Sequence, residues 1–107
     1  MKLIGRLCTF SAVALVFSCQ PSHISPVNKF ADTEIIKIYD FKDRRIADSL
    51  YQYFNHTDEM YRAEAALALA SIQDSSSINA LAKMLTDKSQ TVRASAAFAI
   101  GQIKSSS

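Results

Sequence analysis

One segment of this chain recurs at a fixed spacing, and this repeat constrains the fold more than any other feature. The segment YRAEAALALASIQD covers residues 61–74, and VRASAAFAIGQIKS covers residues 92–105. A shorter relative, EIIKIYDFKD, covers residues 34–43, at the same spacing before the second half of the first segment. A unit that cannot bury its own apolar face gains a continuous core by stacking on its copies. The sequence therefore predicts a tandem-repeat fold, and the repeat itself identifies no active site.

Shifting the sequence by one repeat, so that position 61 falls on position 92, aligns large apolar residues, helix caps and arginines. The aligned pairs are Leu50 and Leu81, Phe54 and Leu85, Asp58 and Ser89, Tyr61 and Val92, Arg62 and Arg93, and Asp43 and Asp74. The alanines Ala63, Ala65, Ala66 and Ala68 likewise align with Ala94, Ala96, Ala97 and Ala99. Alanine has a high helix propensity and lets neighbouring helices approach closely. Each unit is therefore expected to pair a first helix rich in large apolar residues with an alanine-rich second helix.

Five helices are predicted, and no segment alternates in the manner of a strand. Four of them begin after residues whose side chains can accept backbone N–H bonds in the first turn, namely Asp32, Asp58, Asp74 and Ser89. The predicted helices cover residues 33–42, 44–54, 59–72, 75–86 and 90–104. We therefore expect an all-α repeat domain over residues 32–104, with a polar tail over residues 105–107.

The repeat resembles the short HEAT-like repeats of phycobilisome-lyase-related proteins. That family shows a turn aspartate, an aliphatic first helix, a cap, and then Val-Arg opening an alanine-rich helix that ends in Leu-Gly-x-Ile. The later copy matches at Asp74, Ile78, Ala80, Leu81, Leu85, Ser89, Val92, Arg93, Ala96, Ala97, Ile100, Gly101 and Ile103. The earlier copy matches at Asp43, Leu50, Phe54, Asp58, Arg62, Ala65, Ala66, Leu69 and Ile72, and departs with Tyr61 for valine and Ala70 for glycine.

This resemblance implies a short right-handed α-solenoid of stacked antiparallel helix pairs, with about two and a half repeats in this chain. It also implies that the stack binds something, usually a protein. It does not imply lyase chemistry, because a fold by itself does not specify an activity.

The N-terminal stretch over residues 1–18 has the pattern of a bacterial lipoprotein signal peptide. Lys2 and Arg6 give a positively charged start, and the apolar stretch over residues 7–17 is too short to span a bilayer as a helix. The lipoprotein resemblance implies cleavage after Ser18 and lipid attachment to Cys19. The alternative is an ordinary secretory signal that happens to end near a cysteine.

The match to the lipoprotein cleavage motif is carried by Val16, Ser18 and Cys19, whereas Phe17 is bulkier than most versions allow. Residues 19–31 hold both prolines and lack periodicity, so they are predicted to form a flexible tether between lipid and domain. No acidic run follows Gln20, and similarity to Gram-negative sorting then favours the outer membrane, facing the periplasm.

Charge and cysteine content exclude several classes of partner. The net charge of +2 comes from Lys2 and Arg6, and the chain beyond residue 18 carries ten basic and ten acidic residues. A near-neutral domain is not expected to bind nucleic acid, which requires a basic surface. Cys8 lies in the leader and Cys19 is the proposed anchor, so no disulfide or cysteine metal cluster is expected.

The sequence holds no constellation typical of catalysis. His23 lies in the predicted tether and His56 in a turn, and neither has a second ligand residue at metal-binding spacing. A glycine-rich phosphate loop is also missing from the sequence. We therefore expect no catalytic residues, no metal and no cofactor.

Two sets of residues at equivalent positions of the repeat can each be interpreted in two ways. Arg62 and Arg93 could grip an acidic partner, or they could pair with turn aspartates such as Asp58, Asp74 or Asp87 and link adjacent repeats; the second interpretation is favoured.

The column formed by Ile36, Leu67 and Phe98 could fill the groove between successive second helices, or it could form an exposed apolar strip that binds a peptide or a partner helix. On a helical wheel Leu67 lies at least 120° from the stripe that contains Leu69 and Ile72. These three residues are the candidate partner-binding site.

The final helix is followed only by a short polar tail, whereas solenoids usually carry a polar terminal cap. Either Ile100 and Ile103 meet another subunit, or the chain is a shortened relative of a longer array.

The main functional hypothesis is a lipid-anchored scaffold for protein–protein contact in the bacterial cell envelope. The alternative is an accessory or truncated piece of a longer repeat protein or enzyme whose catalytic domain is absent, and a standalone lyase is the least favoured hypothesis.

Overall fold

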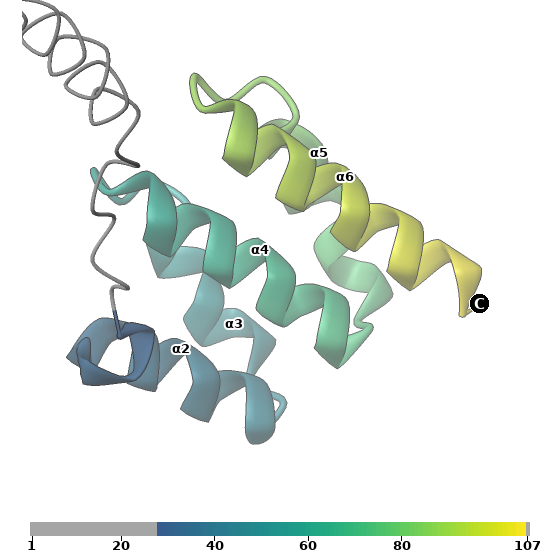
Figure 1. Cartoon of the computed structure of the whole chain (residues 1–107). Coiled ribbons are helices and arrows are strands. Elements are labelled where there is room, and N and C mark those ends of the chain that lie inside the picture. The colour runs from purple at the N-terminus through teal and green to yellow at the C-terminus, as the bar shows by residue number, and fades with distance from the viewer. Residues whose placement is uncertain (1–27, 107) are drawn as a thin grey trace, which may run out of the picture.

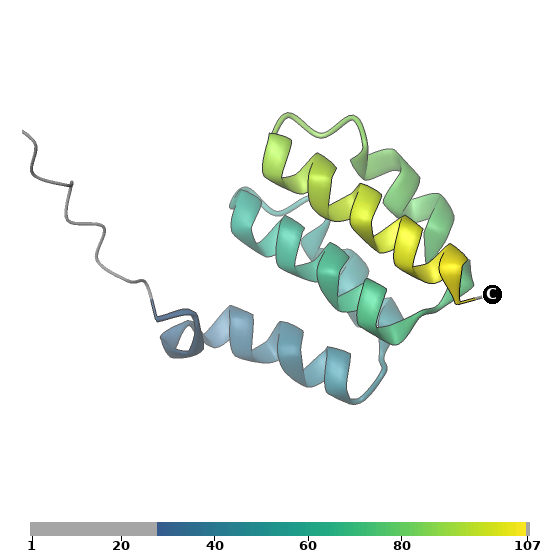
Figure 2. The same cartoon turned by 45° about the vertical axis from the view of Figure 1, so that its right-hand side comes forward.

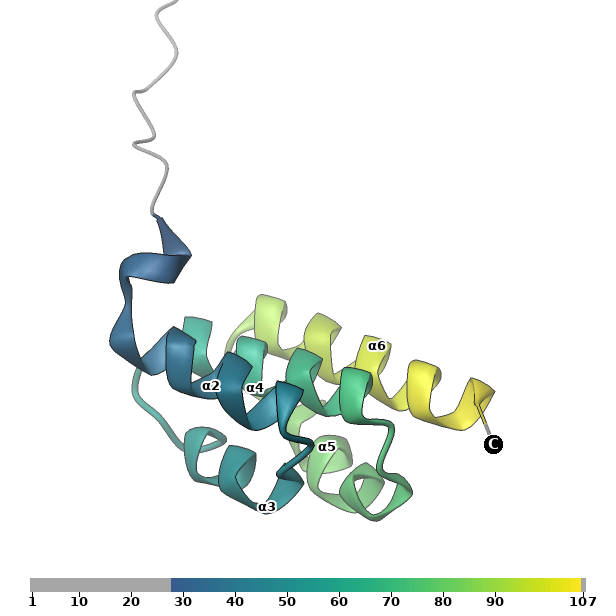
Figure 3. The same cartoon turned by 90° about the horizontal axis from the view of Figure 1, so that it is seen from below.

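The computed structural model describes residues 28–106, and within this range the regular elements are all helical. In chain order they are the 3-10 helix η2 (Lys29–Ala31), α2 (Thr33–Asp43), α3 (Ala47–Leu50), the 3-10 helix η3 (Tyr51–Tyr53), α4 (Glu59–Ile72), the 3-10 helix η4 (Ser75–Ser77), α5 (Ile78–Met84) and α6 (Gln90–Ser105). Helices α2, α4 and α6 form one layer, and α3 and α5 form a second layer against it, as Figure 3 shows. The predicted fold, a short helical solenoid, is confirmed.

Helix caps fix where the repeat units begin. The side chains of Asp32, Asp58 and Ser89 accept hydrogen bonds from backbone N–H groups in the first turns of α2, α4 and α6. Asp74 does the same for the 3-10 turn that precedes α5. Such caps satisfy N–H groups that have no partner inside the helix. All four predicted caps are therefore confirmed.

The first helix of each pair is shorter than predicted. The predicted helix 44–54 is divided into α3 and η3, and the predicted helix 75–86 begins as η4 and continues as an α-helix only from Ile78 to Met84. Runs of 3-10 geometry are common at helix ends, where they tighten the last turn. Capping residues and apolar spacing do not distinguish the two geometries.

Arg45 explains why the second predicted helix begins late. This residue takes the left-handed conformation, with φ of 57°, and the N–H of Ile46 donates to the carbonyl of Phe41 at 2.9 Å. This pattern closes the C-terminus of α2. The Nη2 of Arg45 also donates to the carbonyl of Ile72 at 2.6 Å, at the C-terminal end of α4. A cation at the end of a helix interacts favourably with its dipole, which offsets the cost of the backbone conformation.

The core lies between the two layers and along the contacts of α4, which sits between α2 and α6 (Figures 1 and 2). Leu50, Leu69 and Leu81 are fully buried, and all five alanines of α4 are buried with them. A subunit contact through Ile100 and Ile103, one of the two alternatives for the last helix, is not supported at Ile103, which is only 1% exposed, and Ile100 packs half-buried against the same core. Helix α6 also continues to Ser105, one residue into the predicted polar tail.

The predicted tether over residues 19–31 is corrected at its end. Asn28 caps η2, and the Lys29 Nζ lies 2.6 Å from Oε1 of Glu64 on α4. This ion pair holds residues 28–31 against the helical domain. The predicted signal peptide over residues 1–18 and most of the tether lie outside the described residues. Among residues 28–106, no helix combines the length and apolarity needed to cross a bilayer.

Candidate functional site

Ile36, Leu67 and Phe98 lie at equivalent positions of α2, α4 and α6, and we call them the apolar strip. Ile36 is 48% exposed and Phe98 is 55% exposed, whereas Leu67 is half-buried. The three helices run side by side in one layer (Figure 2). The interpretation that these residues fill the groove between successive second helices therefore applies only to Leu67. The strip is exposed at both ends, as the other interpretation expects.

Leu67 forms a wall shared by two shallow depressions. One lies between α4 and α6 with a volume of about 360 Å³, and the other lies between α2 and α4 with a volume of about 140 Å³. The first is lined by Leu67, Ala70, Ser71, Gln73, Phe98 and Gln102, and the second by Tyr39, Lys42, Glu64, Leu67, Ala68 and Ser71. A ridge of apolar side chains between two grooves with polar rims is a surface that can seat side chains of a partner.

The N-terminal end of the strip has a polar rim built around Glu64, which is 9% exposed. Its two carboxylate oxygens accept from Lys29 at 2.6 Å and from the Tyr39 hydroxyl at 3.3 Å. The hydrogen bond to Glu64 raises the pKa of Lys29, and burial raises the pKa of Tyr39. Lys42 lies 4.5 Å from the centroid of the Tyr39 ring, and the Phe30 ring, 71% exposed, lies 5.9 Å from the same ring.

Sequence reasoning missed Phe30 and Glu64 as members of this surface. The sequence did mark Glu64 as unusual, because the residues at the same position of the other copies, Thr33 and Ser95, carry no charge. A carboxylate in an alanine-rich helix face requires a partner once it is buried. The partner, Lys29, lies far away in the sequence, and no local pattern points to it.

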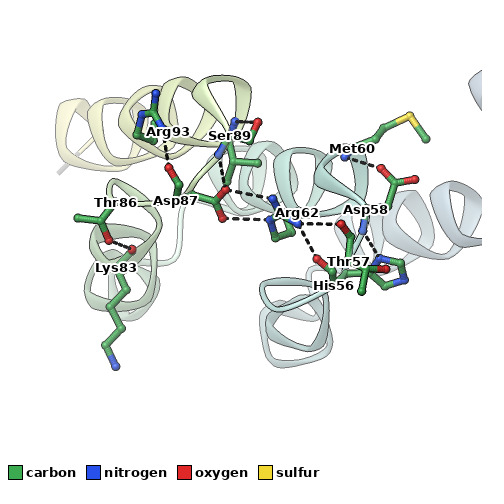
Figure 4. Close-up of polar contacts among 11 residues, drawn as sticks. His56, Thr57, Asp58, Met60, Arg62, Lys83, Thr86, Asp87, Ser89 and Arg93 are labelled. Atoms are coloured by element: carbon green, nitrogen blue, oxygen red, sulfur yellow. Dashed lines mark hydrogen bonds and ion pairs between the residues drawn. The ribbon is translucent and has the colours of Figure 1, made fainter.

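Arg62 connects the two complete repeats (Figure 4). Its Nε and Nη2 lie 3.0 and 3.1 Å from the two carboxylate oxygens of Asp87, and its Nη1 donates to the carbonyl of His56 at 2.6 Å. Both side chains are largely buried. These hydrogen bonds hold the pKa of the Asp87 carboxyl below its usual value. The structural interpretation of Arg62, pairing with a turn aspartate of the next repeat, is therefore correct.

Arg93, the counterpart of Arg62, makes only part of this set of contacts. Its Nη1 donates to the carbonyl of Asp87 at 2.6 Å, in the loop before its own helix. Among residues 28–106, no carboxylate accepts from its Nε or Nη2.

Tyr61 stands where the later copy has Val92, and its hydroxyl makes a contact that valine cannot make. It donates to Oδ2 of Asp32 at 2.6 Å, so the side chain that caps α2 is also fixed by α4. This hydrogen bond raises the pKa of Tyr61 to about 12 and lowers the pKa of Asp32. The contact links the half repeat to the first complete one.

The described residues bring together no catalytic arrangement. His56 accepts from the N–H of Asp58 at 3.0 Å through Nδ1, and its ring meets the Tyr61 ring edge-on at 4.6 Å between centroids. Within residues 28–106, no three His, Cys, Asp or Glu side chains could share a metal ion. The proposed anchor Cys19 and His23 lie outside the described residues.

Comparison with known proteins adds a family. A model of HEAT repeats matches residues 34–107, which cover all of the helical layers from α2 onward. No curated protein and no solved structure matches the chain significantly.

Proposed function

This chain belongs to the HEAT repeat family, whose members generally serve as protein-interaction scaffolds, and from that premise we propose that it is a scaffold without catalysis of its own. Its partner is a protein, and the contact is made through the apolar strip and the two depressions that flank it. Repeat stacks present extended surfaces of this kind to their ligands.

The main support for this proposal is that apolar side chains at one position of the repeat are exposed. An isolated exposed apolar residue is ordinary, but here Ile36, Leu67 and Phe98 line up across three neighbouring helices. With helix axes 8–10 Å apart, such a strip extends over roughly 20 Å. That length suits an amphipathic helix whose apolar face lies against it.

Replacing Phe98 with glutamate should strongly reduce capture of the partner without unfolding the domain. The carboxylate would be buried without a counter-charge in the complex, which should weaken binding at least about tenfold. Phe98 is more than half exposed in the free protein, so helicity measured by circular dichroism should not change. The assay is affinity capture from detergent-solubilised envelope, with the full chain as bait.

The matched control is Asn79→Glu, which adds the same charge to the exposed surface of α5 in the other layer. It should capture the partner as well as the unmodified chain does. Equal recovery of the partner by Phe98→Glu would remove the strip from the proposal. Loss of helicity in Phe98→Glu would show that the residue belongs to the core.

We further propose that the scaffold is attached to the bacterial cell envelope through a lipid on Cys19, at the outer membrane facing the periplasm. The support is sequence pattern alone, namely the charged start, the apolar stretch over residues 7–17, and Val16 and Ser18 before the cysteine. Two or three acyl chains on one residue would anchor firmly, because each buried methylene contributes about 0.8 kcal/mol.

A Cys19→Ser variant should move from the membrane fraction to the soluble fraction of lysed cells, because serine cannot form the thioether that carries the lipid. The measurement is immunoblotting of both fractions, together with metabolic labelling by a fatty acid. Cys8→Ser is the control, since Cys8 lies in the predicted leader and its loss should leave labelling and fractionation unchanged. A Cys19→Ser protein that keeps its label and its membrane association would refute the lipid anchor.

A further inference from the structure

A short segment before α2 covers one end of the face that carries the apolar strip. Residues 28–31, which we call the strap, contain η2 and lie on the side of the α2, α4 and α6 layer opposite α3 and α5, as the dark blue turn in Figure 3 shows. The strap contacts Glu64 of α4 through Lys29, and Tyr39 of α2 through Phe30. Both contacted residues line the depression between α2 and α4, so the strap lies beside this depression.

The strap is held by few contacts. No residue of η2 is buried, and the Phe30 ring is 71% exposed although it lies beside Tyr39. Among the described residues, the only hydrogen bond that joins the strap to an α-helix runs from the Lys29 Nζ to Oε1 of Glu64, at 2.6 Å. The Lys29 side chain is 51% exposed, and ion pairs with a solvated member stabilise a fold only modestly. The strap can therefore detach without opening the helical core.

Glu64 requires a cation whether or not the strap is attached. Its side chain is only 10% exposed, and its second oxygen accepts from the Tyr39 hydroxyl at 3.3 Å. A buried carboxylate without a counter-charge is strongly unfavourable. The neutral residues Thr33 and Ser95 occupy the same position in the other copies, so repeat stacking does not need a charge there. The carboxylate is a property of this face and not of the repeat.

Charge decides which side chain can replace Lys29 on Glu64. A lysine or arginine of a partner would restore the ion pair and leave the total charge of the depression unchanged. Lys42, the basic residue that lines the depression, is already engaged with Asp43 at 3.6 Å and with the Tyr39 ring at 4.5 Å. A partner carboxylate would be repelled by Glu64, and an apolar side chain would leave Glu64 unpaired. The depression therefore selects a cation.

We propose that the depression between α2 and α4 receives a lysine or arginine of the partner, which displaces Lys29 and pairs with Glu64. This inference rests on the proposed function, because it adds a charged contact beside the apolar strip. Glu64 and Leu67 lie about one turn apart on α4, so one amphipathic helix can place an apolar side chain on Leu67 and a cation on Glu64. The strap is then an internal competitor that lowers the affinity for this basic segment.

The first test needs no partner and uses butylammonium chloride, whose chain and charge match those of a lysine side chain. Lys29→Ala frees Glu64, and butylammonium should raise the melting temperature of this variant by about 2 °C or more in a saturable manner, because it binds only the folded chain. Sodium chloride and butanol at equal concentrations should not. Adding Glu64→Gln should remove the rise.

Lys37→Ala is the matched control for the amine measurement. It breaks another lysine–glutamate pair, but the carboxylate that it frees, Glu34, is 35% exposed and keeps its water. Butylammonium should not stabilise this variant. The proposal would be overturned by a melting temperature of Lys29→Ala that does not respond to butylammonium, or by an equal rise after Glu64→Gln.

The second test compares how much partner each full-length chain retains from detergent-solubilised envelope when the bait is limiting. Lys29→Ala should retain about threefold more than the unmodified chain, because the competitor is gone. Lys29→Ala combined with Glu64→Gln should retain less than the unmodified chain. Equal retention by all three, with Phe98→Glu still reducing it, would refute the displacement and leave the apolar strip in place. Retention of no protein by any chain would refute the proposed function and this inference with it, even where butylammonium binds.

Discussion

Replacing Arg62 with alanine should lower the free energy of unfolding by about 3–5 kcal/mol, the loss expected when one partner of a buried ion pair is removed. The Arg62 side chain is 5% exposed and that of Asp87 is 14% exposed. The variant would leave the Asp87 carboxylate without its guanidinium and the loop carbonyl of His56 without its donor. For a domain of this size the expected total is only about 4–12 kcal/mol. Urea unfolding followed by circular dichroism measures the loss.

Arg93→Ala is the matched control, because it removes the same side chain from the same repeat position. It should cost only about 1 kcal/mol, since Arg93 makes a single hydrogen bond to a carbonyl and no carboxylate among residues 28–106 depends on it. Equal losses in the two variants would show that the ion pair contributes nothing beyond the loop contact.

The loss of unfolding free energy caused by Arg62→Ala should also depend on pH. Arg62 holds the pKa of Asp87 below its usual value in the folded state. A carboxyl whose folded pKa is depressed stabilises the fold fully above its unfolded pKa of about 3.9, and this contribution is lost as the pH falls through the folded pKa. The difference between Arg62→Ala and the unmodified chain should therefore be larger at pH 7 than at pH 3.

Replacing Leu69 with alanine should lower the free energy of unfolding by about 2–5 kcal/mol, the range for truncating a fully buried leucine. Leu69 is 0% exposed in the middle of α4, where the cavity could be closed only by moving helices on both sides. The same urea titration would show it as a lower midpoint with an unchanged slope.

The repeat supplies the control for Leu69 as well. Ile100 occupies the same position in α6 and is half-buried, so Ile100→Ala should cost about 1 kcal/mol, because neighbouring groups and water can fill the space. Equal losses in the two variants would show that burial at the centre of the stack does not determine the loss of unfolding free energy.

The sequence predicted the second helices of the repeats best. Helix α4 covers Glu59–Ile72 as expected, because a capping aspartate and a long alanine-rich run both favour one geometry. The first helices were predicted too long. Their ends depend on 3-10 turns and on the left-handed conformation of Arg45, which is supported by a carbonyl of α4 and not by its own neighbours in sequence.

The sequence predicted which residues form the candidate site but not how exposed each of them is. The repeat spacing alone was enough to place Ile36, Leu67 and Phe98 on one face. Their exposure depends on which helices have a neighbour on each side, which is a property of the stack. For the same reason the sequence pointed to Ile103 as an open contact, although that residue is buried against the other layer, and it overlooked the small residues that are exposed on α6.

The two hydrogen-bonded contacts that tie residues 28–32 to α4 also decide how the domain would respond to force. A pull on the chain from the side of residue 28 does not act on α2 alone, because Lys29 is held by Glu64 and Asp32 is held by Tyr61. Both of these partners lie on α4, the helix at the centre of the stack. Tension entering at the N-terminal end is therefore shared with the most buried helix before α2 can peel away. A domain held through its N-terminal side would in this way resist unzipping from the end on which the load acts.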